Sequence, residues 1–260
     1  MRQTFTIATL KSAVFAVVAL SGPGMTGHLR ADDQIDKKVV EIVKKTGELY
    51  KNAKSFHADG TFVSKVENGD AKREINVKGV YDVERPNRLS LRTQLEGKSD
   101  SGPDIIADGK KLSVHAKGRK EYIQEDTPEN LGEIGLKLLQ FGPAMTGMLF
   151  ANVLGDDPAG LLMDGVNSCS YVGKDKVDGT PVDRMKFSQD QFDWELWVAA
   201  EGKPYVLRMI RIGEGPGGKI TTTETYKNWK LDGAIPQETF KFSAPKDAKK
   251  VDDFESGESK

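Results

Sequence analysis

The sequence predicts a mainly β protein of the α+β class, built on a single curved antiparallel sheet of about ten or eleven strands. Short runs rich in β-branched and aromatic residues recur along most of the chain, separated by turn pairs such as Asn68-Gly69 and Asp108-Gly109. Helical spacing of apolar residues occurs only near the start and in the middle. The single cysteine, Cys169, excludes an internal disulfide, so folding must rest on an apolar core.

Residues 1–31 are predicted to be a secretory signal peptide that is cleaved after Ala31. Arg2 and Lys11 precede a short apolar run from Ser12 to Leu20. This run is too short to cross a bilayer, because a spanning helix needs about 20 apolar residues. No second candidate follows, so the mature chain is expected to have no transmembrane span. An uncleaved N-terminal anchor is the alternative, and both interpretations predict export.

The charge balance argues against nucleic acid as a partner. The full chain has 38 basic and 39 acidic residues, and removal of residues 1–31 takes away three basic residues and no acidic one. The mature chain therefore has a net charge of about −4, which disfavours binding to a polyanion. It also lacks a basic amphipathic helix of the kind that holds proteins on anionic membrane surfaces.

The predicted domain covers residues 32–245 and begins with an amphipathic helix. Asp32 and Asp33 suit a helix start, and apolar residues then follow at helical spacing. These apolar residues are Ile35, Val39, Ile42, Val43, Leu49 and Tyr50. A first block of predicted strands covers residues 62–66, 74–83, 88–94, 104–107, 111–116 and 119–124. Because the intervening turns are short, neighbouring strands are expected to pair antiparallel in chain order.

Helical spacing returns in the middle of the chain. The apolar residues of the first helical segment are Leu131, Ile134, Leu138 and Phe141, and those of the second are Met145, Met148, Leu149 and Val153. Gly142-Pro143 ends the first segment, and Asp157-Pro158 begins a third helix that runs through Met163. These helices interrupt the strands, so they are expected to fill the concave face of the sheet.

A second block of predicted strands covers residues 168–174, 182–188, 194–199, 205–212, 220–229 and 240–242, and residues 246–260 then form a polar C-terminal tail. Alternation along one strand puts Trp194, Leu196 and Val198 on the same face, which is expected to be the concave one. Trp197 then lies on the opposite face, either under a crossing loop or exposed for a partner.

Several motifs resemble those of a known family. They are Val83-Glu84-Arg85-Pro86-Asn87-Arg88-Leu89, Asp108-Gly109-Lys110-Lys111-Leu112, Tyr122, the strand from Asp193 to Val198, Pro204 with Arg208, Trp229 and the ending from Phe240 to Pro245. In order and spacing they resemble an uncharacterised family of predicted periplasmic proteins, which is similar in fold to the LolA-like lipoprotein carriers. The resemblance implies a periplasmic location and an open half-barrel, plugged by helices, that binds acyl chains or hydrophobic peptides. Fold carries over better than function.

Seven apolar residues are the candidate ligand-binding residues: Met145, Met148, Leu149, Phe150, Met163, Trp194 and Leu196. Flexible thioether side chains adapt to variable apolar ligands, which is why the methionines suggest a ligand. Packing of the helices on the sheet explains the same residues without one. The two interpretations differ in whether the interior is hollow. No catalytic residue, metal site or cofactor is predicted.

Four features that suggest enzyme chemistry are better explained structurally. The glycine spacing from Gly213 to Gly218 matches a dinucleotide motif, but the β-branched run that follows predicts a hairpin loop instead of the required helix. His57 and His115 lie in no protease or zinc motif. Asp193 and Glu195 are expected to form a solvent-facing stripe, and Cys169 a small buried residue.

Two functions follow from these expectations. One is an exported carrier or sensor that binds a lipid, a lipoprotein acyl chain or a hydrophobic peptide. The alternative is a non-catalytic interaction or structural module of the cell envelope, with a filled core and a protein partner. The protein is expected to be a monomer, and a hydrolase ranks last.

Overall fold

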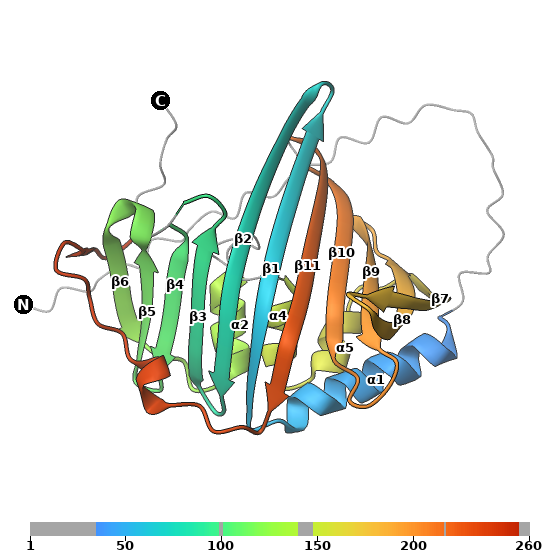
Figure 1. The fold of residues 1–260 in the computed structure, drawn as a ribbon, viewed down its shortest axis with the longest axis horizontal. Coiled ribbons are helices and arrows are strands. Elements are labelled where there is room, and N and C mark those ends of the chain that lie inside the picture. The colour runs from blue at the N-terminus through green and yellow to red at the C-terminus, as the bar shows by residue number, and fades with distance from the viewer. Residues whose placement is uncertain (1–34, 99–100, 140–147, 216, 255–260) are drawn as a thin grey trace, which may run out of the picture. The chain divides into compact units, whose positions relative to one another are not determined.

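The computed structural model describes residues 35–98, 101–139, 148–215 and 217–254, so the expected signal peptide, residues 1–31, lies outside the described part of the chain. The strands form one twelve-stranded sheet in the order β12-β6-β5-β4-β3-β2-β1-β11-β10-β9-β8-β7. Figure 1 shows this sheet curving around helices that lie behind it. The predicted mainly β fold with a single open, curved sheet is confirmed, with twelve strands in place of ten or eleven.

Two antiparallel meanders make up almost the whole sheet. The first contains β1 (Ser55–Asn68), β2 (Ala71–Glu84), β3 (Arg88–Leu95), β4 (Pro103–Asp108), β5 (Lys111–Ala116) and β6 (Glu121–Asp126). The second contains β7 (Ser168–Val177), β8 (Thr180–Ser188), β9 (Phe192–Ala199), β10 (Val206–Gly215) and β11 (Gly218–Leu231). β1 pairs antiparallel with β11 and joins the two meanders at the centre of the sheet. The predicted pairing of sequential strands is confirmed.

The glycine-rich segment before β11 is a hairpin loop, as predicted. Gly215 pairs with Gly218 where β10 turns into β11. Gly218 has a φ of +103°, and a Cβ there would approach the carbonyl oxygen of Glu67 to 2.2 Å. Only glycine fits this position, because any other side chain would collide with the neighbouring backbone. The glycine spacing thus serves a tight turn, not a phosphate-binding loop.

Helices line the concave face. They are α1 (Lys37–Asn52), α2 (Leu131–Leu139), α4 (Met148–Leu154) and α5 (Pro158–Met163). Asp157 caps α5 just before Pro158, as predicted. α1 begins later than Asp32 and Asp33 suggest, because Asp36 supplies the cap by accepting a hydrogen bond of 2.8 Å from the backbone N–H of Lys38.

The predicted inward face of the tryptophan strand is confirmed. Trp194, Leu196 and Val198 belong to one large core cluster with the inner faces of the helices, and each is at most 3% exposed. Trp197 lies on the other face in a small cluster with Val177 and Val182 from the β7–β8 hairpin. Trp197 is therefore buried by neighbouring side chains and is not exposed for a partner.

The end of α1 is fixed to the second meander through Val206. The hydroxyl of the buried Tyr50 accepts a hydrogen bond of 3.0 Å from the backbone N–H of Val206. The indole Nε1 of Trp229 donates to the carbonyl of the same residue at 2.8 Å. Both backbone groups of Val206 are thus satisfied by aromatic side chains where β10 begins.

After β11 the chain runs along one end of the sheet to its outer edge at β6 (Figure 1), and residues 232–250 are called the C-terminal strap below. The predicted strand at residues 240–242 is wrong: a short 3₁₀ helix, η2 (Gln237–Phe240), precedes an extended segment without strand pairing. Phe240 is fully buried beside the guanidinium of Arg88, and the Phe242 ring lies 5.3 Å from that of Tyr122. The alternation of apolar residues here reflects two aromatic anchors, not a strand.

The residues expected to form a polar tail reach the sheet edge. Within them, β12 (Lys249–Lys250) pairs in parallel with Glu121 and Tyr122 of β6. This pairing attaches the strap to the outer edge of the first meander. A second 3₁₀ turn, η1 (Lys117–Arg119), connects β5 to β6.

Candidate functional site

The candidate site is the interior between the concave face and the helices. Leu149 and Phe150 of α4 and Trp194 and Leu196 of β9 are buried in one core cluster, and Met163 of α5 packs against it at partial exposure. The structure thus brings together five of the seven predicted ligand-binding residues. Met145 lies outside the described residues, and so does the side chain of Met148 at the start of α4.

Aromatic rings of the central strands form the surface under α4. The Phe150 ring lies 4.3 Å from that of Tyr81 on β2 and 5.9 Å from that of Phe56 on β1. Tyr226 on β11 lies 5.7 Å from Tyr81. Trp194 is part of a second group and stacks on Phe187 at 3.7 Å. The interior therefore combines two aromatic groups, which bury large apolar areas on neighbouring strands.

A buried carboxylate lies in this apolar interior, and the sequence analysis did not identify it. Glu224 on β11 is 3% exposed. Its Oε2 accepts hydrogen bonds from the backbone N–H of Leu149 at 3.1 Å and from the hydroxyl of Tyr226 at 2.9 Å. These three groups are called the Glu224 latch below. The latch satisfies a first-turn amide of α4, where a negative charge is favourable.

Glu224 influences the pKa values of neighbouring side chains in the interior. Burial, and then the charge of Glu224, raise the pKa of Tyr81 and of Tyr226, so both hydroxyls stay protonated at neutral pH. Burial lowers the pKa of Arg211 on β10, whereas the charge of Glu224 opposes this shift. A buried charge needs such partners, because removing it from water is costly.

Glu224 was missed because its strand is polar on both faces. The run Thr221-Thr222-Thr223-Glu224-Thr225 has no apolar alternation that would mark the inward side. The one available signal was Tyr226, two residues further on and therefore on the same face.

The opposite end of α4 is held by an arginine. Arg85, in the turn between β2 and β3, donates from Nη1 to the carbonyl of Leu154 at 3.5 Å, the last residue of α4. It also donates from Nε to Ala53 and from Nη2 to Tyr50, at 3.2 and 3.3 Å, at the end of α1. This Arg85 clamp places a positive charge at two helix C-termini, where it is stabilising.

The same turn holds two further segments. The amide of Asn87 donates to the carbonyl of Pro128 at 3.0 Å, just before α2. Arg88 donates to Glu84 and, at 2.6 Å, to Oε1 of Gln237 in the C-terminal strap. One of the motifs that resemble the family, residues 83–89, is therefore the place where the helices and the strap meet the sheet.

Two of the residues considered for catalysis, His57 and Glu195, are held by charged partners. Nδ1 of His57 lies 2.7 Å from Oδ1 of Asp82, while Glu195 pairs with Arg184 at 2.6 Å on the convex face. Burial raises the pKa of the Cys169 thiol, which disfavours the reactive thiolate. Within the described ranges, no group of three or more His, Cys, Asp or Glu side chains is arranged to hold a metal ion.

One protein family matches almost the whole described chain. A model of the family described as predicted periplasmic protein (DUF2092) matches residues 39–253. The chain belongs to this family. Membership in DUF2092 confirms the resemblance expected from the sequence and agrees with the expected periplasmic location. A search of curated proteins gives no match.

Solved structures similar to this DUF2092 protein are distant. An uncharacterised conserved protein from Thermus thermophilus has 10% identity and a TM-score of 0.46, over 83% of this chain and 99% of that chain. A LolA superfamily protein from Nitrosomonas europaea has 12% identity and a TM-score of 0.36, over 78% and 96%. The MucA/MucB complex from Pseudomonas aeruginosa has 14% identity and a TM-score of 0.44, over 80% and 62%. Such distant likeness carries no argument about function.

The helices of the described residues do not include one that is long and apolar enough to cross a membrane.

The Arg85 clamp leads to a first prediction. Arg85→Ala removes a charged donor from three helix-end carbonyls, so we expect the free energy of unfolding to fall by about 2–3 kcal/mol. Chemical denaturation followed by circular dichroism measures this change. Arg73→Ala is the matched control, because Arg73 is exposed on the strand that leads into the turn and should change stability by less than about 0.5 kcal/mol. Equal effects of the two substitutions would contradict the clamp.

Proposed function

We propose that this DUF2092 protein is a periplasmic binding protein that holds a hydrophobic ligand between its concave sheet and its helices, as a carrier or a sensor. The ligand class is a lipid, a lipoprotein acyl chain or a hydrophobic peptide. The observation that carries the proposal is the fastening of α4 over an apolar interior by polar contacts at its two ends.

The Glu224 latch supports a cover that can open. A core that only needs stability gains little from a buried carboxylate, because an apolar side chain of similar size avoids the desolvation penalty. A latch is useful where a cover must close in one defined position and still be released. α4 has only seven residues, so its displacement would expose the aromatic surface formed by Phe56, Tyr81 and Tyr226.

The alternative is a periplasmic interaction module with a filled interior. Its support is the tight burial of Phe150, Trp194 and Leu196, each at most 3% exposed. In both cases the protein is proposed to be non-enzymatic, because His57 pairs with Asp82 and Glu195 pairs with Arg184. We also propose that it acts as a monomer.

The two functions differ in what the purified protein retains. For a carrier or sensor, native mass spectrometry of the mature protein purified from its envelope should show a co-purified apolar ligand. A fluorescent fatty acid should then displace that ligand. If no ligand co-purifies and the fatty acid does not bind, the carrier proposal is wrong and the filled interaction module is favoured.

The latch can be tested separately. Glu224→Gln keeps the shape and one acceptor oxygen but removes the charge, which weakens the bond to Leu149 by about 1 kcal/mol. We expect the association rate of the fluorescent fatty acid to rise about fivefold, measured by stopped-flow fluorescence. Glu67→Gln, an exposed carboxylate on β1, is the control and should leave the rate unchanged. An unchanged rate in Glu224→Gln would exclude a latch role for the carboxylate.

A further inference from the structure

The convex face carries two adjoining hollows that share Arg92 and Lys117. One has a volume of about 590 Å³ and lies over β1, β2 and β3, and the other has about 530 Å³ and lies between β3–β5 and the C-terminal strap. The cationic residues around them are Lys78, Arg92, Lys117, Lys120, Lys227 and Lys241, and the acidic ones are Asp59, Asp104 and Asp247. This surface, called the convex basic site below, is positive in a chain whose formal net charge is −1.

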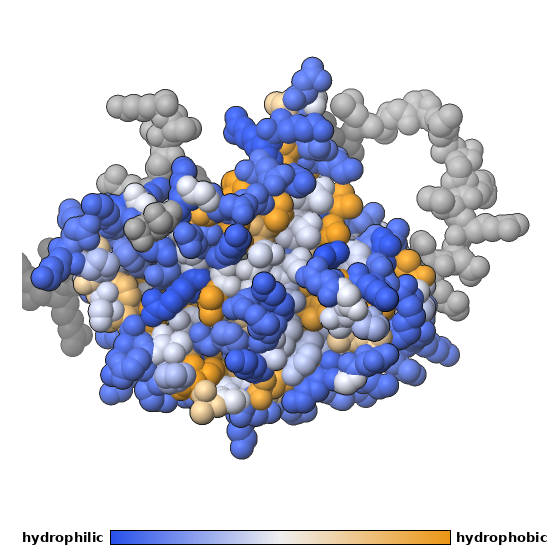
Figure 2. All heavy atoms as spheres, viewed as in Figure 1, coloured by the Kyte–Doolittle hydropathy of each residue, from blue (hydrophilic) through white to orange (hydrophobic). Residues whose placement is uncertain are grey.

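Strand register brings these residues together from distant parts of the sequence. One continuous cross-strand row runs through Lys227, Asp59, Val80, Arg92, Asp104 and His115. Neighbouring strands lie about 4.8 Å apart, so each side chain adjoins the next. Figure 2 views this convex face and shows hydrophilic side chains over most of it.

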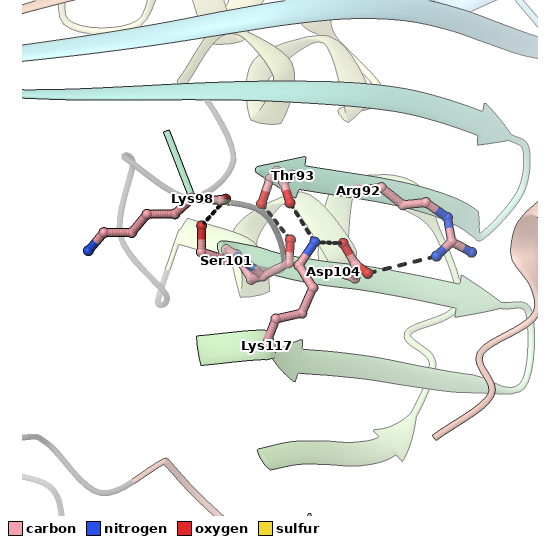
Figure 3. Close-up of polar contacts among 7 residues, drawn as sticks. Arg92, Thr93, Lys98, Ser101, Asp104 and Lys117 are labelled. Atoms are coloured by element: carbon pink, nitrogen blue, oxygen red, sulfur yellow. Dashed lines mark hydrogen bonds and ion pairs between the residues drawn. The ribbon is translucent and has the colours of Figure 1, made fainter. Parts of the chain in front are cut away.

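Asp104 is already neutralised by Lys117. Nζ of Lys117 donates to Oδ1 of Asp104 at 2.9 Å and to the carbonyl of Thr93 at 2.6 Å, as Figure 3 shows. The side chains of Lys117 and Asp104 are only 19% and 15% exposed. This largely buried ion pair lies where the two hollows meet, because Lys117 lines both of them.

Arg92 keeps its hydrogen-bonding capacity. Its Nη1 is 3.8 Å from Oδ2 of Asp104, which is too long for a hydrogen bond, and its side chain is 47% exposed. On its other side lies Val80, which offers no side-chain acceptor. Lys227 makes no ion pair within 4 Å with another described residue, because Asp59 accepts instead from Asn228 at 2.6 Å. Lys227 therefore faces the first hollow without an acidic partner within 4 Å in the described part of the chain. Arg92 has only the 3.8 Å ion pair to Asp104, whose charge is also offset by Lys117.

We propose that the convex basic site binds an anion that carries phosphate groups, with Arg92 as the principal donor and Lys227 as a supporting charge. The planar guanidinium matches two phosphate oxygens at once, which a lysine cannot do. The second hollow, with the ring of Phe242 beside His115, accommodates an organic portion attached to the phosphate. This ligand is a soluble phosphate ester or a phospholipid headgroup, which present the same chemistry.

The site is independent of the proposed hydrophobic site. Arg92 alternates with the inward-facing Leu91 on β3 and therefore points away from the helices. If no hydrophobic ligand binds in the interior, the proposed phosphate site is unaffected. If no phosphate binds on the convex face, the proposed hydrophobic site is likewise unaffected.

The test measures binding of inorganic pyrophosphate to the full mature protein by calorimetry, and binding to vesicles of phosphatidylglycerol, with phosphatidylcholine vesicles as the reference. We expect saturable binding of at least one phosphate probe, weakened about tenfold or more by Arg92→Gln. Arg73→Gln, an exposed arginine outside both hollows, is the matched control and should bind as the unmodified protein does. Both variants should keep the unfolding midpoint, because both arginines are exposed.

The outcomes separate the two sources of phosphate. Arg92-dependent binding of pyrophosphate without vesicle binding supports a soluble ester, and Arg92-dependent binding of phosphatidylglycerol vesicles supports a headgroup. Absence of binding to both probes at about 1 mM overturns the proposal. Equal losses in Arg92→Gln and Arg73→Gln also overturn it, because they would indicate only nonspecific attraction.

Discussion

The guanidinium of Arg85 is the contact on which the arrangement of the helices depends. It binds carbonyls at the ends of α1 and α4, two helices far apart in the sequence, from a single turn of the sheet. In the same turn, Asn87 holds the segment before α2 and Arg88 holds the C-terminal strap. One short turn therefore joins the helices and the strap to the sheet.

The two ends of α4 are fastened by different polar contacts. Glu224 accepts from the first turn of the helix, and Arg85 donates to its last residue. Polar contacts thus define the position of α4, and the aromatic surface beneath it supplies apolar contact area. Hydrogen bonds hold a helix in a defined position, because they weaken steeply when their distance or angle changes. A cover with one closed position is what a carrier or sensor of hydrophobic ligands requires.

The sequence predicted the features of the fold that depend on residues close together in the chain. Turn pairs and alternation predicted the first meander and the five strands of the second, and Trp194 with Leu196 marked the concave face correctly. The long-range features were not accessible in the same way. The pairing of β1 with β11, and the cross-strand row through Arg92, depend on register between distant segments, which spacing along one chain does not reveal. Glu224 was hidden because Thr222 makes its own face of the strand polar, while Thr221 and Thr223 make the other face polar.

The most direct measurement is the position of a bound ligand. A crystal structure of the mature protein with a fatty acid brominated along its chain locates the bromine atoms by anomalous scattering. We expect them between α4 and the concave face, close to Phe150, Tyr81 and Leu196, with α4 displaced or its latch to Glu224 lengthened. Bromine found only outside this interior, or no ordered bromine at saturating fatty acid, would contradict a hydrophobic binding site beneath the helices.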